Sequence, residues 1–443
     1  MKTVTRLAAL GVWLAVAPAS AQVRDAAPPL RLTLDEAVRR GLETSHRLAE
    51  AVARGDVADA IAGQRHASTL PQVAAQAGYT RTNHVEAFGV LLPTNQLRVI
   101  YPDIPDNYRT RLDLQWPIYT GGRLDALERA VRIDASASAD EIAIVRGDLT
   151  LEITRAYWAF MTSTESLRVV ESSLTRVDAH LRDVRNQLAA GLVPPSDVFS
   201  ADAQASRQRM LTVQARSNRD IVEAELGRLV GAPPGTPIET AATLDALAPP
   251  PAPLDELIDA ARLQRPERAA LLKRAGAAGE RARAAAAGTK PTVAVGGGVD
   301  YASPNPRIFP RDEAWRTSWD ASVNLTWPIF DGGRARSEMA ETAALMRAVQ
   351  ERLAEFDASL AVEIRQRVSE IVSSRAAIDA AADAVRSAAE ARRVLGERFA
   401  AGVATSTDVL DAQVALLQAE LDRAQATANA HLADARLARA LGK

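Results

Sequence analysis

Two carboxylates near the carboxyl end of the chain have the type and spacing to act on a charged ligand. Asp408 and Asp411 stand three residues apart at the expected start of a helix, so both side chains point to one helical face. Carboxylates held this close repel each other and bind cations. The structural alternative is a pair of ordinary first-turn acids that are stabilised by the helix dipole.

The sequence has no motif typical of an enzyme. It lacks HExxH, GxSxG and P-loop patterns, and the glycine run VGGGVD at 295–300 lacks the spacing and the following helix of a dinucleotide site. The histidines are scattered without ligand spacing on a common helical face. They are His46, His66, His84, His180 and His431. We therefore expect no enzymatic activity, no cofactor and no bound metal.

The amino-acid composition excludes further classes of protein. The 443 residues include no Cys, which excludes disulfides, Cys-ligated zinc and thiol catalysis. The formal net charge of −2 gives no indication of nucleic-acid binding. Residues 1–21 have the pattern of a secretory signal peptide: a basic start, an apolar run and a small-residue cleavage site. Because no later apolar stretch is long enough for a membrane helix, we expect an exported protein that is either soluble or a β-barrel.

The rest of the chain consists of two copies of one sequence repeat. WPIYTGGR at 116–123 returns as WPIFDGGR at 327–334, and the stretch around Gly191 returns around Gly402, both at an offset of 211 residues. The first copy is expected over 22–247 and the second over 254–443. The Pro-rich segment 248–253 is expected to join them as an extended linker.

Long segments without proline predict the helices. Residues 123–190 and 334–401 would each form a helix about 100 Å long at 1.5 Å per residue. Four further helices are expected to have about half that length. They are 34–66, 196–230, 254–286 and 407–441. Two short helices placed end to end would therefore pack along one long helix, with seams of the coiled-coil type.

Alternating segments predict two strands in each copy. These strands are expected at about 71–80, 108–117, 291–301 and 318–328. One face is apolar and the other polar, which suits the half-buried sheet of a soluble domain or a membrane sheet. The secretory signal and the Trp residues at the strand ends favour the membrane. Because four strands cannot close a barrel, several chains would have to share one.

The repeated Trp-Pro motif marks the corner between strand and long helix. Trp116 and Trp327 are expected to anchor the chain at the membrane interface, with packing inside the corner as the alternative. The other corner residues are Pro117, Gly121 and Gly122 in the first copy and Pro328, Gly332 and Gly333 in the second. Gly191 and Gly402 stand where a helix must turn back sharply, and glycine permits the positive φ that such a turn needs.

This duplicated order of helix, strands, corner, long helix and glycine turn resembles the TolC family of outer-membrane efflux proteins, over nearly all of the chain. The resemblance implies a mainly α protein with a small membrane β part. A homotrimer would pool twelve strands in one barrel across the outer membrane of a Gram-negative bacterium. A long α-helical coiled-coil barrel would continue it into the periplasm.

The resemblance also assigns roles to residues. Asp408 and Asp411 match the acidic pair that lines the periplasmic entrance in the best-known family member, although Ala404 stands where that member has an Arg. The tips at Gly191, Asp197 and Gly402 would dock on a periplasmic adaptor (membrane fusion) protein. That adaptor would connect the duct to an inner-membrane pump of the RND, ABC or MFS type.

The expected function is a passive exit duct for small molecules such as drugs and other toxic compounds. An outlet of a type I protein-secretion system is an alternative that no residue separates from it. A soluble periplasmic coiled-coil scaffold is an alternative of another class.

Overall fold

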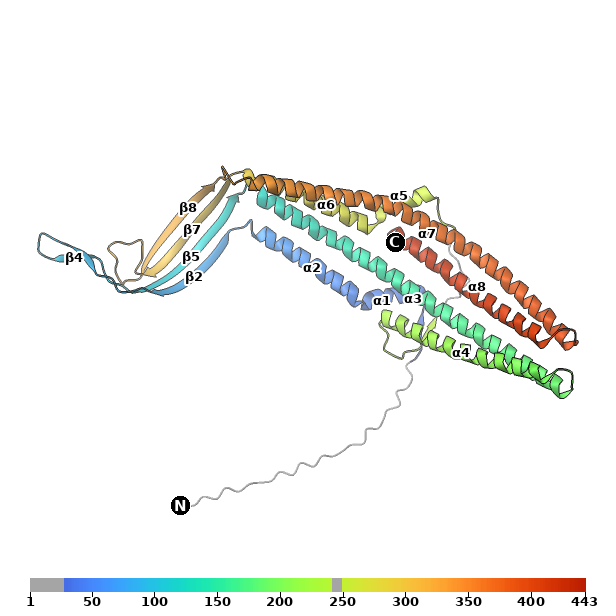
Figure 1. Cartoon of the computed structure of the whole chain (residues 1–443). Coiled ribbons are helices and arrows are strands. Elements are labelled where there is room, and N and C mark those ends of the chain that lie inside the picture. Colours follow the sequence, from blue (N-terminus) through green and yellow to red (C-terminus); the bar gives the residue numbers. More distant parts are fainter. Residues whose placement is uncertain (1–27, 241–248) are drawn as a thin grey trace, which may run out of the picture.

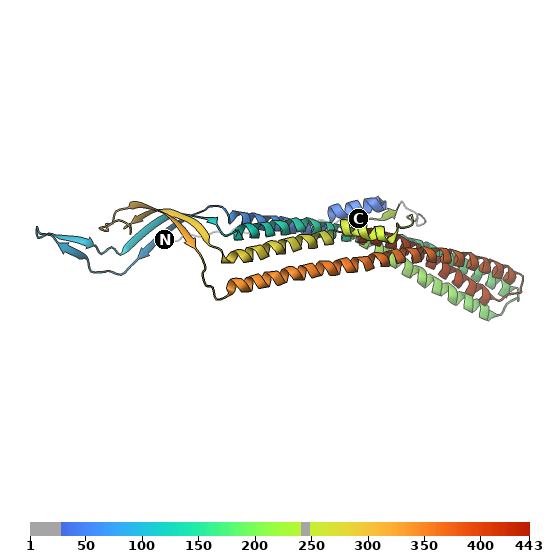
Figure 2. The same ribbon diagram turned by 90° about the horizontal axis from the view of Figure 1, so that it is seen from above.

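The computed structural model describes residues 28–240 and 249–443. The expected signal peptide and residue 248 of the expected linker lie outside these ranges. Figure 1 shows an elongated molecule with a β-sheet at one end and two helical hairpins that reach to the other. The view from above in Figure 2 shows the same long shape.

Helices make up most of the described residues. They are α1 (Leu34–Thr44), α2 (His46–Ala67), α3 (Arg123–Ala189), α4 (Pro195–Leu229), α5 (Leu254–Gln264), α6 (Pro266–Ala286), α7 (Arg334–Ala400) and α8 (Ser406–Ala440), with a short 3-10 turn at Ala287–Thr289. The strands are β1 (Leu30–Leu32), β2 (Gln72–Arg81), β3 (Phe88–Leu91), β4 (Leu97–Tyr101), β5 (Asp106–Tyr119), β6 (Ile238–Thr240), β7 (Thr292–Ser303) and β8 (Arg316–Thr326).

Each long helix is accompanied by shorter ones. Helices α3 and α7 have 67 residues each, and so a length of about 100 Å. Helix α2 packs on the sheet-proximal half of α3 and α4 on the distal half, while α6 and α8 do the same for α7. Helices α6 and α8 also pack against α3, which joins the two copies along their length.

The expected single helices 34–66 and 254–286 are each two helices in the structure, so that expectation was wrong. The first breaks at Ser45, whose side chain accepts a hydrogen bond from the amide of Leu48 and caps α2. The second breaks at Arg265, because Pro266 disfavours a helical conformation in the residue before it. Both breaking residues have ψ of 116°, so the two copies bend in the same way.

The four expected strands form one antiparallel sheet in the order β2-β5-β7-β8. Their ends differ from the expected ones by a few residues. Strand β8 ends at Thr326, so Trp327 and Pro328 lie beyond it, whereas β5 runs through Trp116 and Pro117 to Tyr119. The register against β7 shifts between Pro117 and Tyr119.

The pairing register separates the two faces of the sheet. Leu112, Val299 and Trp319 stand opposite one another on three neighbouring strands, and all three are exposed. Val73, Val323 and Leu325 extend this exposed apolar face. The other face carries charged and small polar residues. A water-soluble domain would cover such an apolar face, so the exposed side chains indicate a sheet that meets lipid.

Four more strands were not expected. Strands β3 and β4 form a hairpin within the segment between β2 and β5. Strands β1 and β6 form a parallel pair beside the core of Ile153, Tyr157 and Phe160. Three-residue strands are too short to show a period of two. None of the helices within the described ranges combines the length and the apolar composition needed to cross a membrane.

Candidate functional site

The two strand-to-helix corners have the same backbone conformation. Gly121 and Gly122 have φ of 64° and 87°, and Gly332 and Gly333 have φ of 67° and 88°. Helices α3 and α7 begin at the residue after each pair. Two successive positive φ values are accessible to glycine at little cost, which explains why both copies keep the Gly-Gly step.

The corner motif differs between the copies at two positions. At one of them, both residues accept a hydrogen bond from an amide at the start of the long helix. Thr120 of the first copy accepts a hydrogen bond on its hydroxyl from the amide of Leu124, at 3.3 Å. Asp331, in the same place in the second copy, accepts one from the amide of Ala335 at 2.8 Å. Both side chains thus satisfy an amide in the first turn of a long helix.

Both corner tryptophans make the same hydrogen bond. The indole N–H of Trp116 donates to the carbonyl of Thr69 at 3.3 Å, and that of Trp327 donates to the carbonyl of Thr289 at 3.2 Å. The two tryptophan residues remain 41% and 61% exposed. Each indole therefore has its polar group bound to the chain while much of its side chain stays exposed.

At the far ends of the helices, Gly191 and Gly402 close two identical turns. Both have φ of 72°. The amide of Leu192 donates to the carbonyl of Gln187, and the amide of Val403 donates to that of Arg398, each at 2.9 Å. This pattern is the Schellman motif, in which the residue at the Gly position adopts a left-handed conformation.

Asp408 forms a capping box with Thr405 at the start of α8. Its carboxylate accepts from the Thr405 amide at 2.8 Å and from the Thr405 hydroxyl at 2.7 Å, and these bonds lower the pKa of Asp408. Asp411 lies one turn further on, and both carboxylates are exposed while Val409 and Leu410 are buried. The structure therefore brings the pair to one exposed face, and it also gives Asp408 a structural role as a member of the capping box, which the sequence analysis did not expect.

Asp197 occupies the same helical position in the first copy but has different neighbours. Helix α4 begins after Pro194, which has neither the amide hydrogen nor the hydroxyl that Thr405 offers to Asp408. Asp197 accepts only a 3.3 Å hydrogen bond from the hydroxyl of Ser196 among the described side chains. The two tips therefore have the same backbone conformation at their glycines, but their Asp residues have different hydrogen-bond partners.

The first tip also exposes apolar residues that sequence reasoning missed. Phe199 is 74% exposed, whereas Leu410, its counterpart at the same offset, is buried. Leu192 and Val403 are exposed beside the two glycine turns. The feature of the sequence that could have indicated this exposure is that Phe199 stands where the second copy has Leu410.

A buried polar contact joins the two helical hairpins near the tips. His180 of α3 and the hydroxyl of Ser406 in α8 lie 2.9 Å apart, and both residues are buried. Phe399 packs against the imidazole at 5.0 Å between ring centroids. Burial is the main cause that lowers the pKa of His180. Arg176 and Glu420 form a second link between α3 and α8, at 2.9 Å.

An ion-pair cluster covers the polar face of the sheet. Arg111 of β5 reaches Asp300 on β7 and, at 2.9 Å, Asp320 on β8. Arg109 pairs with Asp300 at 2.6 Å. The Arg111 guanidinium passes directly over Gly298, which explains one glycine of the VGGGVD run. Sequence reasoning identified the polar face but not this cluster.

The fold and these features define an outer-membrane channel protein with a helical periplasmic extension. A family model described as "Outer membrane efflux protein" matches residues 37–232 and 257–443. The chain belongs to this family of channel proteins, which are not enzymes. It resides in the outer membrane of a Gram-negative bacterium, reaches into the periplasm, and serves as an exit duct for efflux or secretion.

Relatives are similar to this chain over most of its length. Protein CyaE of Bordetella pertussis is 26% identical over 86% of this chain and 78% of its own length. Outer membrane protein TolC of Vibrio cholerae is 23% identical over 92% of this chain and 90% of its own. The crystal structure of the Vibrio cholerae outer membrane protein VceC has a TM-score of 0.77 at 21% identity, over 92% of this chain and 96% of that chain.

Two further relatives have names that state a role. Cobalt-zinc-cadmium resistance protein CzcC of Cupriavidus metallidurans is 25% identical, over 75% of this chain and 77% of its own length. Alkaline protease secretion protein AprF of Pseudomonas aeruginosa is 22% identical, over 72% of this chain and 67% of its own.

Proposed function

We propose that three copies of the chain form one passive exit duct for small toxic molecules, including drugs. The observation that carries this proposal is the sheet. Its edge strands, β2 and β8, have unpaired backbone groups, and its apolar face is exposed. Lipid cannot satisfy a strand edge, so β2 of one copy has to pair with β8 of the next until the sheet closes. Three copies supply twelve strands.

In this assembly the Arg111 cluster faces the water-filled lumen, and Trp116 and Trp327 lie at the periplasmic boundary of the membrane. Each indole N–H is already bound to a backbone carbonyl, so the exposed ring contacts lipid without leaving a polar group unpaired. Lipid on one face of the sheet and water on the other account for the alternation of apolar and polar residues in the strands.

Asp408 and Asp411 form the entrance at the other end of the duct. Three copies would place six carboxylates around the axis, where they attract cations and repel anions. The Thr405 capping box supports this role, because it lowers the pKa of Asp408 and keeps it ionised. Ala404 cannot form the lock that an Arg would provide, so the acidic ring is the main barrier at the entrance.

The tips at Gly191, Asp197 and Gly402 dock on a periplasmic adaptor (membrane fusion) protein. The exposed side chains of Phe199 and Leu192 support this role, since apolar residues on an otherwise polar tip favour a protein partner. An inner-membrane pump of the RND, ABC or MFS type supplies the energy through that adaptor. The duct itself needs no cofactor or metal.

A type I protein-secretion outlet is the second candidate, and the similarity to AprF favours it. The similarity to CzcC favours small solutes, here metal ions. A deletion strain separates the two. Loss of the gene should raise sensitivity to toxic compounds or metals if the duct serves efflux. Unchanged sensitivity together with loss of a secreted protein from the medium would overturn the efflux assignment and establish secretion.

A further inference from the structure

The hairpin of β3 and β4, residues 88–101, has a surface that the exit-duct function does not explain. We call it the outer hairpin, because it extends beyond the end of the sheet that lies away from the helices (Figure 1). Phe88, Leu91 and Leu97 are 65%, 63% and 62% exposed. Val90 and Val99 are also exposed.

Such a hairpin needs a partner. An isolated two-stranded hairpin is marginally stable in water, and a continuous apolar surface on an external loop marks a site of interaction. In one copy of the chain the outer hairpin is paired only within itself, β3 with β4, among the strands described. The partner must therefore come from outside the single chain.

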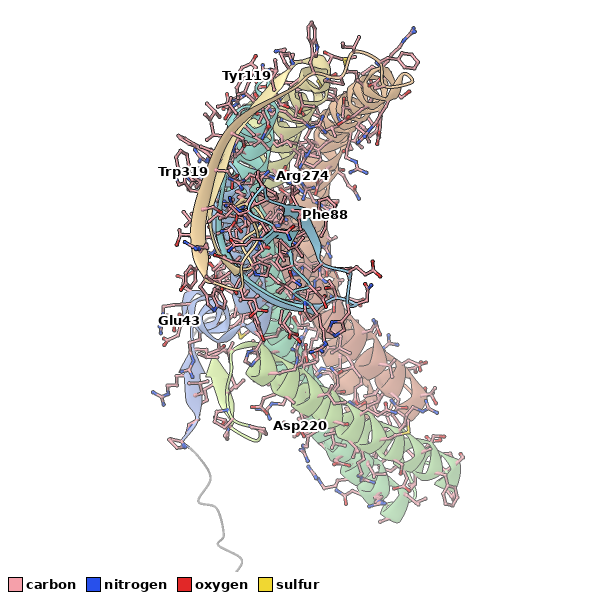
Figure 3. The ribbon with its side chains drawn as sticks, turned by 90° about the vertical axis from the view of Figure 1, so that its left-hand side faces the viewer. Glu43, Phe88, Tyr119, Asp220, Arg274 and Trp319 are labelled. Carbon is pink, nitrogen blue, oxygen red and sulfur yellow. The ribbon has the colours of Figure 1, made fainter. Side chains whose placement is uncertain are left out.

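The position of the outer hairpin identifies that partner. Figure 3 looks at the molecule from the sheet end and shows the sheet as an arc. Trp319, on the apolar face, lies on the convex side, and the hairpin with Phe88 lies on the concave side. Lipid meets the convex side, so the outer hairpin as a whole lies away from lipid and on the side of the axis of the proposed duct.

Contacts at its base hold the outer hairpin in this position. Arg311, in the loop between β7 and β8, donates a 2.9 Å hydrogen bond to the hydroxyl of Tyr101, and its guanidinium lies 5.3 Å from the centre of that ring. His84 and Asp103 lie 2.7 Å apart across the base. Buried Asn305 donates to the carbonyl of Arg316 at 2.9 Å and so orders the loop that carries Arg311.

We propose that the outer hairpins of three copies pack against one another over the outer mouth and form an apolar constriction there. The inference rests on the proposed trimer. Symmetry would bring three equivalent hairpins, each held on the concave side, to one axis. Their apolar side chains would cover one another and leave a narrow opening lined by apolar groups. The duct would then have an acidic constriction at the periplasmic end and an apolar one at the outer end.

The absence of cysteine from the chain allows a direct test. Single variants Phe88→Cys and Leu97→Cys would be produced in the outer membrane as the full mature chain and oxidised there. We expect a disulfide-linked dimer from each. Trp319→Cys is the matched control: it is equally exposed but lies on the convex side, so it should give none. Leu91→Cys provides a third position if one variant fails to reach the membrane.

Two results would overturn the constriction while leaving the duct intact. One is a stable trimer, measured by size in detergent, whose hairpin cysteines do not cross-link. The other is quenching of a fluorophore on Cys-substituted position 97 by nitroxide lipids, which would place the hairpin in the bilayer. A chain that is monomeric in detergent and in the membrane would overturn the proposed trimer, and the constriction with it.

Discussion

Trp116 donates its indole hydrogen bond to the carbonyl of Thr69, and Trp327 repeats the bond to Thr289 in the second copy. In each pair the acceptor lies a few residues before the strand that opens its copy's part of the sheet, β2 in the first copy and β7 in the second. The repeated corner thus ties the start and the end of each strand pair together at one level of the molecule. That level is the proposed periplasmic boundary of the membrane.

Removing the indole hydrogen-bond donor should destabilise the corner between strand and helix. Trp116→Phe and Trp327→Phe keep an aromatic ring but lose one hydrogen bond each, which is worth about 1 kcal/mol. We expect a lower midpoint of thermal unfolding of the purified trimer for each variant. Trp319→Phe, on the lipid-facing side of the sheet, is the control. An equal effect at all three positions would mean that ring size, and not the hydrogen bond, determines stability.

The glycine turns at the tips should not tolerate a side chain. Gly191→Ala and Gly402→Ala force a positive φ on a residue with a Cβ, which costs about 1 kcal/mol or more. Gly396→Ala lies inside α7 with open space around the new methyl, and helix propensity predicts a gain there of about 0.5–1 kcal/mol. Hydrogen exchange of the tip amides should therefore increase in the first two variants and not in the third.

Gly298 is expected to be required for the Arg111 cluster. A Cβ at this position would stand 2.6 Å from the Arg111 guanidinium and 2.9 Å from the carbonyl of Leu112. Gly298→Ala should thus displace Arg111 from Asp320 and reduce the yield of heat-resistant trimer on gels. Gly78→Ala is the control. Gly78 lies in β2 on the same face of the sheet, and a Cβ there would have no heavy atom within 4 Å. Equal yields from both variants would show that the cluster does not hold the sheet together.

The contact between His180 and Ser406 should make the tips sensitive to acid. Burial lowers the folded-state pKa of His180 below its ordinary value of 6.5, so the folded state favours the neutral ring. Stability is then complete above about pH 6.5 and falls as the pH drops from there toward the folded-state pKa. Proteolysis of the tips should become faster over this range. His180→Gln, which cannot be protonated, should remove the pH dependence; an unchanged profile would exclude His180 as its source.

The sequence predicted the parts of the fold that depend on local pattern. The long helices lack proline, the strands alternate, and Gly191 and Gly402 mark turns that need positive φ. The breaks at Ser45 and Arg265 were missed, because one capping residue or one proline at a helix start does not interrupt the apolar period. The outer hairpin was missed because its strands are short and apolar on both sides.

Features that depend on the pairing of distant strands could not be predicted. Arg111 and Asp300 are 189 residues apart in the chain, and only the register of β5 against β7 brings them together. The burial of His180 against Ser406 likewise depends on how the two hairpins pack. The capping role of Asp408 was visible in the spacing of Thr405 and Asp408, and it does not conflict with a role at the entrance.

The most direct test of the acidic entrance is planar-bilayer conductance of the purified mature protein, with trivalent cations on the periplasmic side. The comparison is wild type against Asp408→Asn/Asp411→Asn, which removes the charges but keeps an oxygen that can accept the capping bonds of Thr405. Thr405→Ala, which weakens the cap but keeps both charges, is the control. We expect cation-selective channels that trivalent cations block in the wild type and in Thr405→Ala and leave open in the double variant. Equal block of all three would contradict the acidic entrance, and a protein that never conducts would contradict the duct itself.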